Sequence, residues 1–125
     1  MRVRLLLSLC AALWTVHAGA QTFLSGEQAF AACAGCHSLA PDAPHRVGPN
    51  LHGVVGSAAA SRPDYAYSPA LTDSGIQWSR EYLFAWIAGS EHLVPGSWML
   101  YDNILRPEEV QALIDYLEHG AAPEP

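Results

Sequence analysis

One five-residue motif, Cys33-Ala34-Gly35-Cys36-His37, constrains this chain more than any other feature of its sequence. Two cysteines at this spacing, followed directly by a histidine, are the signature of covalent haem attachment through two thioether bonds. The imidazole that follows the second cysteine is placed to bind the iron from one face of the ring. We therefore expect one haem c, attached through Cys33 and Cys36, with His37 as an axial ligand of the iron.

Other interpretations of the cysteine pair remain open from these residues alone. A thioredoxin-like redox pair needs a βαβ context, and the chain has few of the alternating β-branched runs that predict strands. A zinc site needs a second pair of ligands, and the sequence contains no second C-x-x-C and no H-x-x-x-H. A chance match is the third alternative. Haem attachment is the interpretation that we prefer.

The second axial position of the iron separates an electron carrier from an enzyme, because an open position binds oxygen or other small ligands. Met99 is the only methionine besides the initiator, and it follows the turn sequence Pro95-Gly96. We expect its thioether to complete the metal site with His37, and His92 is the best alternative ligand. The other histidines beyond the N-terminal segment are expected to be polar loop or helix-end residues: His45, His52 and His119.

The first 20 residues are typical of a secretory signal peptide. Arg2 and Arg4 precede an apolar run over residues 5–16, and Ala18-Gly19-Ala20 forms a small-residue cleavage site. This run is too short to span a bilayer, although an uncleaved membrane anchor is the alternative. We expect residues 1–20 to be removed and residues 21–125 to form one exported, periplasmic domain with no stable membrane insertion.

Charge excludes several kinds of partner. Residues 21–125 contain four arginines, no lysine and all twelve acidic residues of the chain, so their net charge is −8. Nucleic acid and anionic membrane surfaces repel such a protein.

The domain is also small, and a large apolar cofactor would help it to form a sufficient core. Transient redox protein partners fit this picture, and we expect a monomer.

Three helices are predicted, over residues 25–34, 79–89 and 107–120. Ser25 and Gln28 form a possible capping box, and Ser79 is an N-cap with Gly89 as the expected stop. Between the first two helices lies a long segment rich in turn residues, which suits a compact domain only if it wraps a large non-protein group. The fold class is therefore all-α. Apolar residues follow the helical period in the last helix: Val110, Leu113, Ile114 and Leu117.

Together these motifs resemble the class I cytochrome c family, in particular mitochondrial cytochrome c and bacterial cytochrome c2. The resemblance implies the cytochrome c fold, with about three main helices plus loops around one covalent haem. It implies that the Pro49 carbonyl accepts a hydrogen bond from His37, and that Tyr67 and Trp78 bind a haem propionate. Plain core packing is the alternative for both aromatic residues. The similar segments are Gly26-x-x-x-Phe30-x-x-Cys33, Gly48-Pro49-Asn50-Leu51-His52-Gly53, Gly75-Ile76-Gln77-Trp78, Pro95-Gly96-x-x-Met99 and Leu113-Ile114-x-Tyr116-Leu117.

Several positions depart from the family pattern. Ser57 replaces an arginine near a propionate, and Leu71 replaces an asparagine. Trp86 replaces a tyrosine near the methionine sulfur, which we expect to alter the hydrogen bonding of Met99 and hence the reduction potential. Tyr101 replaces a phenylalanine beside the haem edge. The lysines that surround this edge in mitochondrial proteins are absent, and their places are taken by Glu91, His92 and Trp98.

The function implied is one-electron transfer between redox proteins, for example in a respiratory chain, and not enzymatic catalysis. A haem enzyme or gas sensor with an open or labile sixth position is one alternative. The other is a dedicated electron-accepting subunit of a dehydrogenase. The sequence names neither the donor nor the acceptor.

Overall fold

The computed structural model describes residues 21–120, and the expected signal peptide lies outside them. Four helices follow one another along the chain: α1 (Gly26–Phe30), α2 (Pro69–Thr72), α3 (Arg80–Leu93) and α4 (Pro107–His119). In this part of the chain, pairing between extended segments is limited to one antiparallel bridge, Ala58 with Gln77. The fold class is all-α, as predicted. None of these helices is long and apolar enough to cross a membrane.

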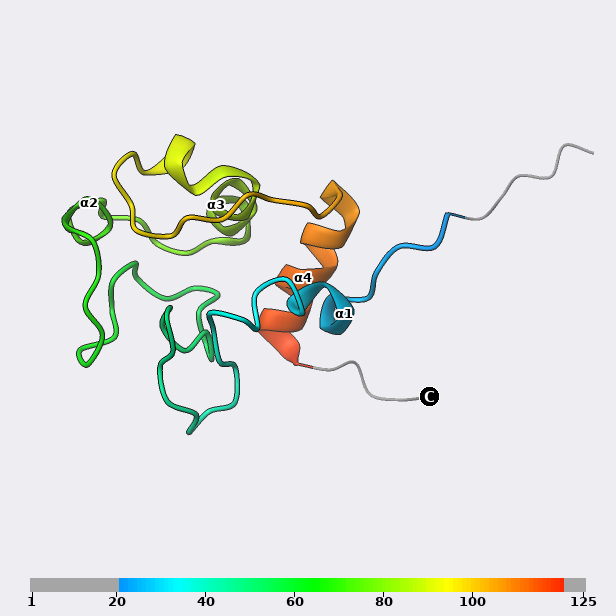
Figure 1. Cartoon of the computed structure of the whole chain (residues 1–125), viewed down its shortest axis with the longest axis horizontal. Helices are drawn as coiled ribbons and strands as arrows, with labels where there is room; N and C mark the ends of the chain where they lie inside the picture. Colours follow the sequence, from blue (N-terminus) through cyan, green and yellow to red (C-terminus); the bar gives the residue numbers. More distant parts are fainter. Residues whose placement is uncertain (1–20, 121–125) are drawn as a thin grey trace, which may run out of the picture.

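The first and last helices cross closely, and α3 also packs against α4 (Figure 1). Gly26 allows the crossing, because a Cβ atom there would lie 2.2 Å from the Ala112 carbonyl oxygen and 2.6 Å from the Tyr116 Cβ. The apolar positions of α4 form the centre of the core, where Val110, Leu113 and Ile114 are almost completely buried.

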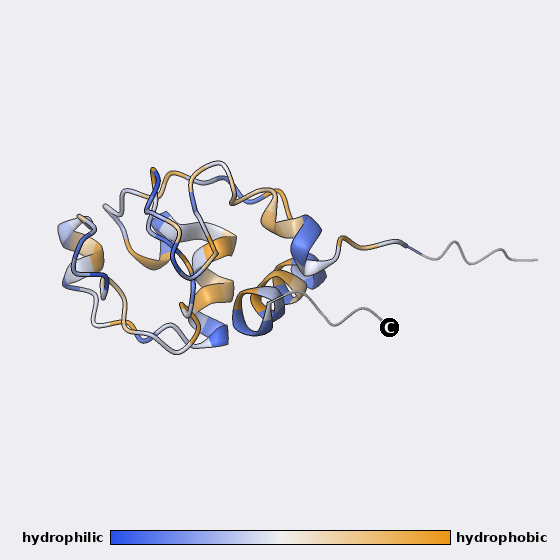
Figure 2. Cartoon of the chain, turned by 90° about the horizontal axis from the view of Figure 1, so that it is seen from below, coloured by the Kyte–Doolittle hydropathy of each residue, from blue (hydrophilic) through white to orange (hydrophobic). Residues whose placement is uncertain are grey.

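Long loops make up the rest of the molecule. The segment between α1 and α3 forms one side of the structure, and the segment between α3 and α4 runs along the opposite side (Figure 1). Helices and loops alike alternate apolar and polar residues, drawn orange and blue in Figure 2. The space between the two loop segments is where the cavity described below lies.

Local capping signals placed the helix starts correctly. Ser25 forms the capping box with Gln28, and the Ser79 hydroxyl accepts from the Tyr82 N–H. The helix ends differ from the prediction. Regular α-helix stops at Phe30, and hydrogen-bonded turns continue the chain through Cys36. Gly89 does not end α3 but breaks it, with φ −177° and ψ 85°, after which a further helical turn reaches Leu93.

The turn sequence Ser68-Pro69 opens a short helix rather than a simple turn. Pro69 occupies the first position of α2, where a missing N–H costs nothing, and the Ser68 hydroxyl accepts from the Leu71 N–H. Ser68 is buried and also lines the cavity. The helix therefore fixes one wall of the cavity.

Candidate haem site

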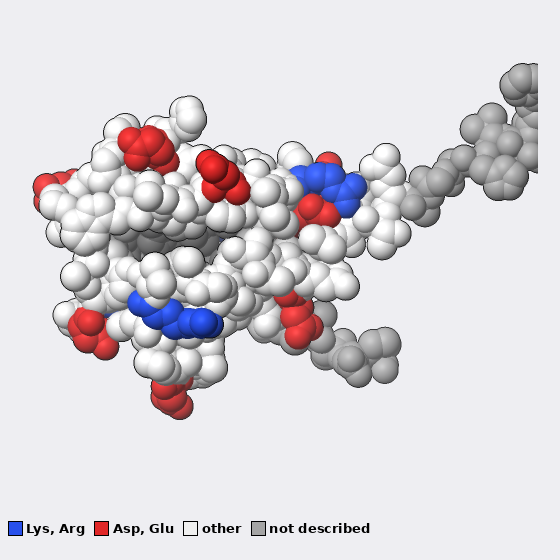
Figure 3. All heavy atoms as spheres, viewed as in Figure 1, with Lys and Arg blue, Asp and Glu red and all other residues white. Residues whose placement is uncertain are grey.

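A cavity of about 540 Å³ lies between the two loop segments and opens as a recess on the face shown in Figure 3. Its lining is mostly apolar, and its size lies within the ordinary range of small-molecule sites. Helices α2, α3 and α4, the turns that follow α1 and the long loops all contribute to its wall. All seven residues that the sequence singles out line it: Cys33, Cys36, His37, Pro49, Tyr67, Trp78 and Met99.

The proximal histidine is held by a backbone carbonyl. His37 Nδ1 lies 2.8 Å from the Pro49 carbonyl oxygen. Because a carbonyl only accepts, Nδ1 carries the proton and Nε2 is the nitrogen that is available to a metal. Burial lowers the pKa of His37, and the bond to Pro49 opposes that shift in part. The imidazole is therefore neutral near pH 7, which is the form that binds iron.

Gly48 lets the chain pass directly against this imidazole. A Cβ atom at Gly48 would lie 2.3 Å from His37 Cε1 and 2.6 Å from Nδ1, so any side chain would displace the ring. The Gly48 N–H donates to the Cys36 carbonyl at 2.7 Å, which ties this loop to the haem-attachment motif. The sequence singled out Pro49 in this segment, and the structure adds a steric reason for the glycine before it.

Both cysteines of the motif carry free thiols and border the cavity. Cys33 is half-buried, and its burial together with the neighbouring Cys36 thiol raises its pKa to about 11. Cys36 is exposed. The Arg46 guanidinium donates to the Ala34 carbonyl at 2.7 Å and fixes the turn between the two sulfur atoms. This arrangement leaves both thiols available for thioether bonds to one bound group.

Met99 approaches the cavity from the loop between α3 and α4. Its sulfur accepts a hydrogen bond from the indole N–H of Trp86, with Nε1 3.0 Å from Sδ. Trp86 is buried on α3 and packs against Trp78, with ring centroids 5.2 Å apart. The sequence predicted altered hydrogen bonding at this methionine because a tyrosine hydroxyl is lost. The structure places an indole N–H as the donor instead.

The polar part of the lining comes mainly from residues 57–68. Tyr67 is half-buried, its hydroxyl accepts from the Arg62 backbone N–H at 3.4 Å, and burial raises its pKa. Trp78 is buried, and its backbone N–H donates to the Ser57 carbonyl of this segment at 2.8 Å. Arg62 is the one charged residue in the cavity lining among residues 21–120. An acidic group bound here would meet a cation and several hydroxyl donors.

Ser97 is a residue that the sequence analysis did not single out. It is buried, and its hydroxyl has no hydrogen-bond partner within the described part of the chain. Buried hydroxyls are almost always paired, so an orphan two residues before Met99 indicates a missing polar partner. Its position in the Pro95-Gly96-x-x-Met99 segment was the only sequence signal for it.

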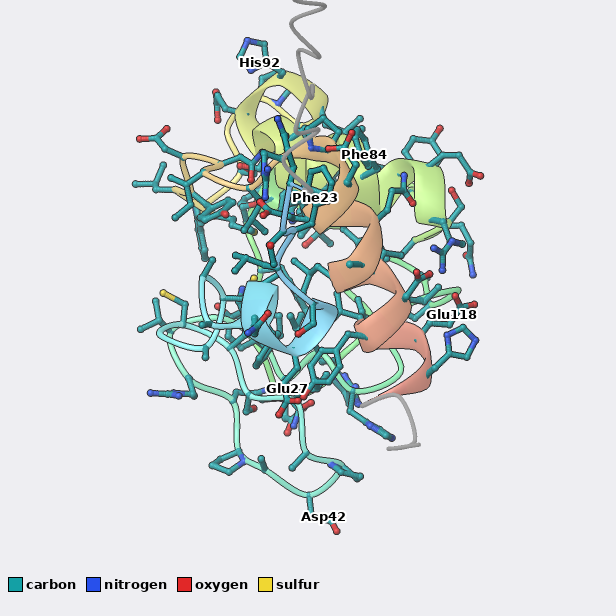
Figure 4. The ribbon with its side chains drawn as sticks, turned by 90° about the vertical axis from the view of Figure 1, so that its right-hand side faces the viewer. Phe23, Glu27, Asp42, Phe84, His92 and Glu118 are labelled. Atoms are coloured by element: carbon teal, nitrogen blue, oxygen red, sulfur yellow. The ribbon has the colours of Figure 1, made fainter. Side chains whose placement is uncertain are left out.

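Within residues 21–120, His37 is the one histidine in the cavity lining. His92 is exposed on the last turn of α3 and points outward in Figure 4. His45 is a hydrogen-bonding loop residue, as predicted, because it accepts from the Asn50 N–H at 2.9 Å and pairs with Asp64 at 2.9 Å. His119 is exposed at the end of α4. The geometry therefore does not favour His92 as the alternative ligand.

The residues present fit haem. The cavity combines a broad apolar lining with one polar segment, as a flat macrocycle with two carboxylates requires. A neutral imidazole and a thioether are available as iron ligands, and two free thiols border the same space. Arg62 offers a cation to acidic groups, and the buried, unpartnered Ser97 hydroxyl lies next in the chain to Trp98 of the lining. The departures Ser57, Leu71, Trp86 and Tyr101 also line the cavity, so each can affect a bound cofactor.

An all-α fold around a haem-sized cavity with this attachment motif defines a class I c-type cytochrome. The family model "Cytochrome c" matches residues 23–121, and the chain belongs to the cytochrome c family. It is 36% identical over 103 residues to cytochrome c2 of Agrobacterium tumefaciens, covering 80% of this chain and 93% of the relative. It is 30% identical over 101 residues to cytochrome c of Ginkgo biloba, covering 80% and 89%.

Comparison with a solved structure also supports membership of the cytochrome c family. Cytochrome cH from Methylobacterium extorquens superposes with a TM-score of 0.69 at 40% sequence identity, covering 74% of this chain and 93% of that one. This identity is high enough that the similarity concerns the family as well as the fold. The family resemblance predicted from the motifs, and the cytochrome c fold, are both confirmed.

Proposed function

We propose that this protein is an exported monohaem cytochrome c that carries single electrons between redox proteins. One haem c is attached through Cys33 and Cys36, and His37 and Met99 are the axial ligands of its iron. The observation that carries the proposal is the meeting of all four side chains in one cavity, although they come from separate segments of the chain. Membership of the cytochrome c family supports the same function.

Bound haem supplies an iron that changes reversibly between the ferrous and ferric states by one electron. The chain contributes the surroundings. Pro49 keeps His37 in the tautomer that leaves Nε2 available. Apolar side chains exclude water from most of the cavity, and Met99 closes the position that a small ligand would otherwise occupy. We infer that the protein performs no catalysis. An iron whose coordination positions are all occupied transfers electrons without binding a substrate.

Electrons would leave through the mouth of the cavity. We define the rim as Val47, Trp98 and Leu100, which line the cavity and are 78%, 64% and 93% exposed. Exposed Cys36 adjoins the same cavity. An apolar surface of this kind suits a transient interface with another redox protein, because it excludes water without requiring fixed ion pairs. Such contacts fit a chain that works as a monomer.

Replacement of Met99 by alanine tests the proposed ligand. We expect haem to remain attached, while the methionine-to-iron charge-transfer band of the oxidised protein disappears and carbon monoxide binds readily to the reduced form. Leu100→Ala is the matched control, because Leu100 is adjacent and almost fully exposed. A low-spin spectrum of unchanged shape in Met99→Ala would refute the assignment.

The same experiment separates the carrier from a haem enzyme or gas sensor. If the native reduced protein binds carbon monoxide as readily as Met99→Ala, the sixth position is open and the enzyme or sensor is the better interpretation. A dedicated dehydrogenase subunit is tested by gel filtration of a cell extract, where a free carrier elutes as a small monomer. Co-elution with a dehydrogenase would contradict the free-carrier proposal.

Export is tested at the N-terminus. We expect the haem-containing protein to be recovered from the periplasmic fraction and to begin at Gln21. A membrane-bound protein that begins at Met1 would instead support the uncleaved anchor.

A further inference from the structure

We propose that α3 acts as a clamp on Met99, with Trp86 holding its sulfur and Ser90 holding its main chain, and that Ser90 is a positioning residue for the axial ligand. The proposal rests on the proposed function, because it assumes that Met99 binds the iron. Trp86 and Ser90 are four residues apart in α3 and lie on either side of the break at Gly89. We refer to this pair as the α3 clamp.

Ser90 makes the main-chain contact of the clamp. Its hydroxyl donates to the Met99 carbonyl oxygen with a separation of 2.8 Å, and Ser90 is only 3% exposed. Among residues 21–120 this is the one hydrogen bond made by the Met99 main chain. A buried serine in a helix usually bonds to its own helix, four residues back. Here the hydroxyl leaves the helix and reaches the loop that carries the ligand.

The break at Gly89 precedes Ser90 directly. The non-helical angles of Gly89 separate the last turn of α3 from the rest of the helix, and the two parts are visible as distinct pieces in Figure 1. The last turn is also tied to the methionine loop, because the Glu91 carboxylate accepts from the Gly96 N–H at 3.1 Å. The break at Gly89 therefore places the last helical turn of α3 alongside the loop that carries Met99.

The loop needs such a contact. Residues 94–106 contain neither helix nor strand, so little regular backbone pairing fixes the position of Met99. A loop of this kind opens more easily than a packed helix. If the ligand leaves the iron for part of the time, an external ligand binds in proportion to that open fraction. The Ser90 bond lowers the open fraction by opposing movement of the Met99 main chain.

Trp86 acts on the sulfur itself. A thioether sulfur has two lone pairs, so Met99 can accept the indole N–H with one and offer the other to iron. An indole is a donor only and does not ionise in the physiological range. Its hydrogen bond withdraws electron density from the sulfur, which disfavours the ferric state more than the ferrous state. Trp86 should therefore raise the reduction potential as well as orient the sulfur.

Imidazole binding to the oxidised protein measures the open fraction. Met99→Ala gives the affinity of a fully open site, and the ratio of its dissociation constant to that of the native protein gives the open fraction. We expect Ser90→Ala to bind imidazole about tenfold more tightly than the native protein. This factor corresponds to about 1.4 kcal/mol, the size of one lost hydrogen bond in a part-buried setting.

Ser79→Ala is the matched control for the serine. Ser79 caps the N-terminus of the same helix, so its loss weakens α3 without touching Met99. We expect Ser79→Ala to lower thermal stability while leaving imidazole affinity at the native value. If Ser79→Ala tightens imidazole binding as much as Ser90→Ala does, the effect comes from helix stability and the positioning role is refuted.

Trp86→Phe tests the other half of the clamp. Phenylalanine keeps an aromatic ring but removes the N–H donor. We expect tighter imidazole binding and a lower reduction potential, where a tenfold change in the electron-transfer equilibrium equals about 59 mV. An unchanged potential would overturn the role of Trp86, and native imidazole affinity in Ser90→Ala would overturn that of Ser90. Equal affinities in the native protein and Met99→Ala would instead refute Met99 as ligand, and with it the proposed function.

Discussion

At the scale of single residues, Arg62 provides the positive charge that the sequence analysis found missing at Ser57. Its guanidinium donates to the His52 carbonyl, and its backbone N–H donates to the Tyr67 hydroxyl. Both Arg62 and Ser57 line the cavity. A cation five residues further along the chain can therefore offset the charge of acidic groups on a bound haem. A family motif marks the arginine at one position only, so it does not reveal a positive charge that stands five residues further along the loop.

Replacement of Arg62 by glutamine should lower the reduction potential. A positive charge near the iron disfavours the ferric state, which carries one more positive charge than the ferrous state. We expect a decrease of about 30–60 mV, because 59 mV corresponds to a tenfold change in a one-electron equilibrium. A reductive titration with optical spectra measures it.

Arg80→Gln is the control for this change in charge. Arg80 pairs on the surface with Asp115 and Glu118 and does not line the cavity. Its replacement should change the potential by much less, because solvent screens an exposed ion pair. Equal shifts in the two variants would mean that net charge, and not the position of Arg62, sets the potential.

At the scale of elements, the N-terminal segment is fastened to the start of α4 by one carboxylate. Glu109 is buried and accepts from the Leu24 N–H at 3.1 Å, from the Arg106 N–H at 2.9 Å and from the Arg106 guanidinium at 2.6 Å. The Arg106 guanidinium also lies 4.1 Å from the centre of the Phe23 ring. Figure 4 shows Phe23 beside the first turn of α4. These contacts close the molecule next to the α1–α4 crossing.

Stability should therefore fall in acid through Glu109. The hydrogen bonds from Arg106 and Leu24 lower the pKa of Glu109 from its ordinary value near 4.5 to about 2. A lowered folded-state pKa contributes stability above pH 4.5, and this contribution is lost as the pH falls from about 4.5 to about 2. Glu109→Gln should be less stable at pH 7 and lose less stability over that interval. Urea unfolding at a series of pH values measures both, with exposed Glu108→Gln as the control.

The α1–α4 crossing depends on Gly26. Replacement by alanine places a Cβ atom against the backbone of α4, which has no flexible side chain that could move away. We expect a loss of about 3 kcal/mol in the free energy of unfolding, at the upper end for overpacking. Gly35→Ala is the control, because no atom lies within 4 Å of a Cβ built there. A loss in Gly26→Ala no larger than in the control would show that the helices can separate at little cost.

The helix starts could be predicted because a cap is a local signal. Ser25 and Ser79 each bond to a backbone N–H three residues later, so neighbouring residues contain all the information. Gly89 was predicted wrongly as a stop. Glycine is permissive and does not by itself end a helix. The contacts that follow it, such as those of Ser90 and Glu91 with the methionine loop, decide that α3 continues to Leu93.

The candidate site followed from the sequence to the extent that its residues belong to motifs. The geometry places His37, Pro49 and Met99 where the motif and the family resemblance put them, although their roles toward iron remain predictions. The bond from Trp86 to Met99 was not predictable in its details, because it joins residues 13 apart through the packing of a helix on a loop. The orphan hydroxyl of Ser97 likewise depends on burial, which no local pattern reveals.

At the scale of the whole molecule, an acidic chain presents an apolar rim. The net charge of residues 21–125 is −8, and Val47, Trp98 and Leu100 are exposed large apolar side chains that line the cavity. Figure 3 shows acidic residues spread over this face and an arginine along one side of the recess. A partner with an acidic docking patch gains no attraction from such a surface. A partner with an uncharged or basic patch fits it better.

Oxidation of the reduced protein by ferricyanide tests this electrostatic picture. The oxidant is an anion, so the negative chain repels it, and added salt screens the repulsion. We expect the bimolecular rate constant to rise several-fold between about 0.01 and 0.2 M ionic strength, because the Debye length falls from about 30 Å to below 10 Å over that range. A cationic cobalt(III) complex should show the opposite trend.

Trp98→Lys, which places a positive charge on the rim, should flatten the rise with ferricyanide, whereas Arg80→Lys should not. A rate that falls with salt in the native protein would mean that the surface near the iron is locally positive despite the net charge, and that acidic partners are attracted after all.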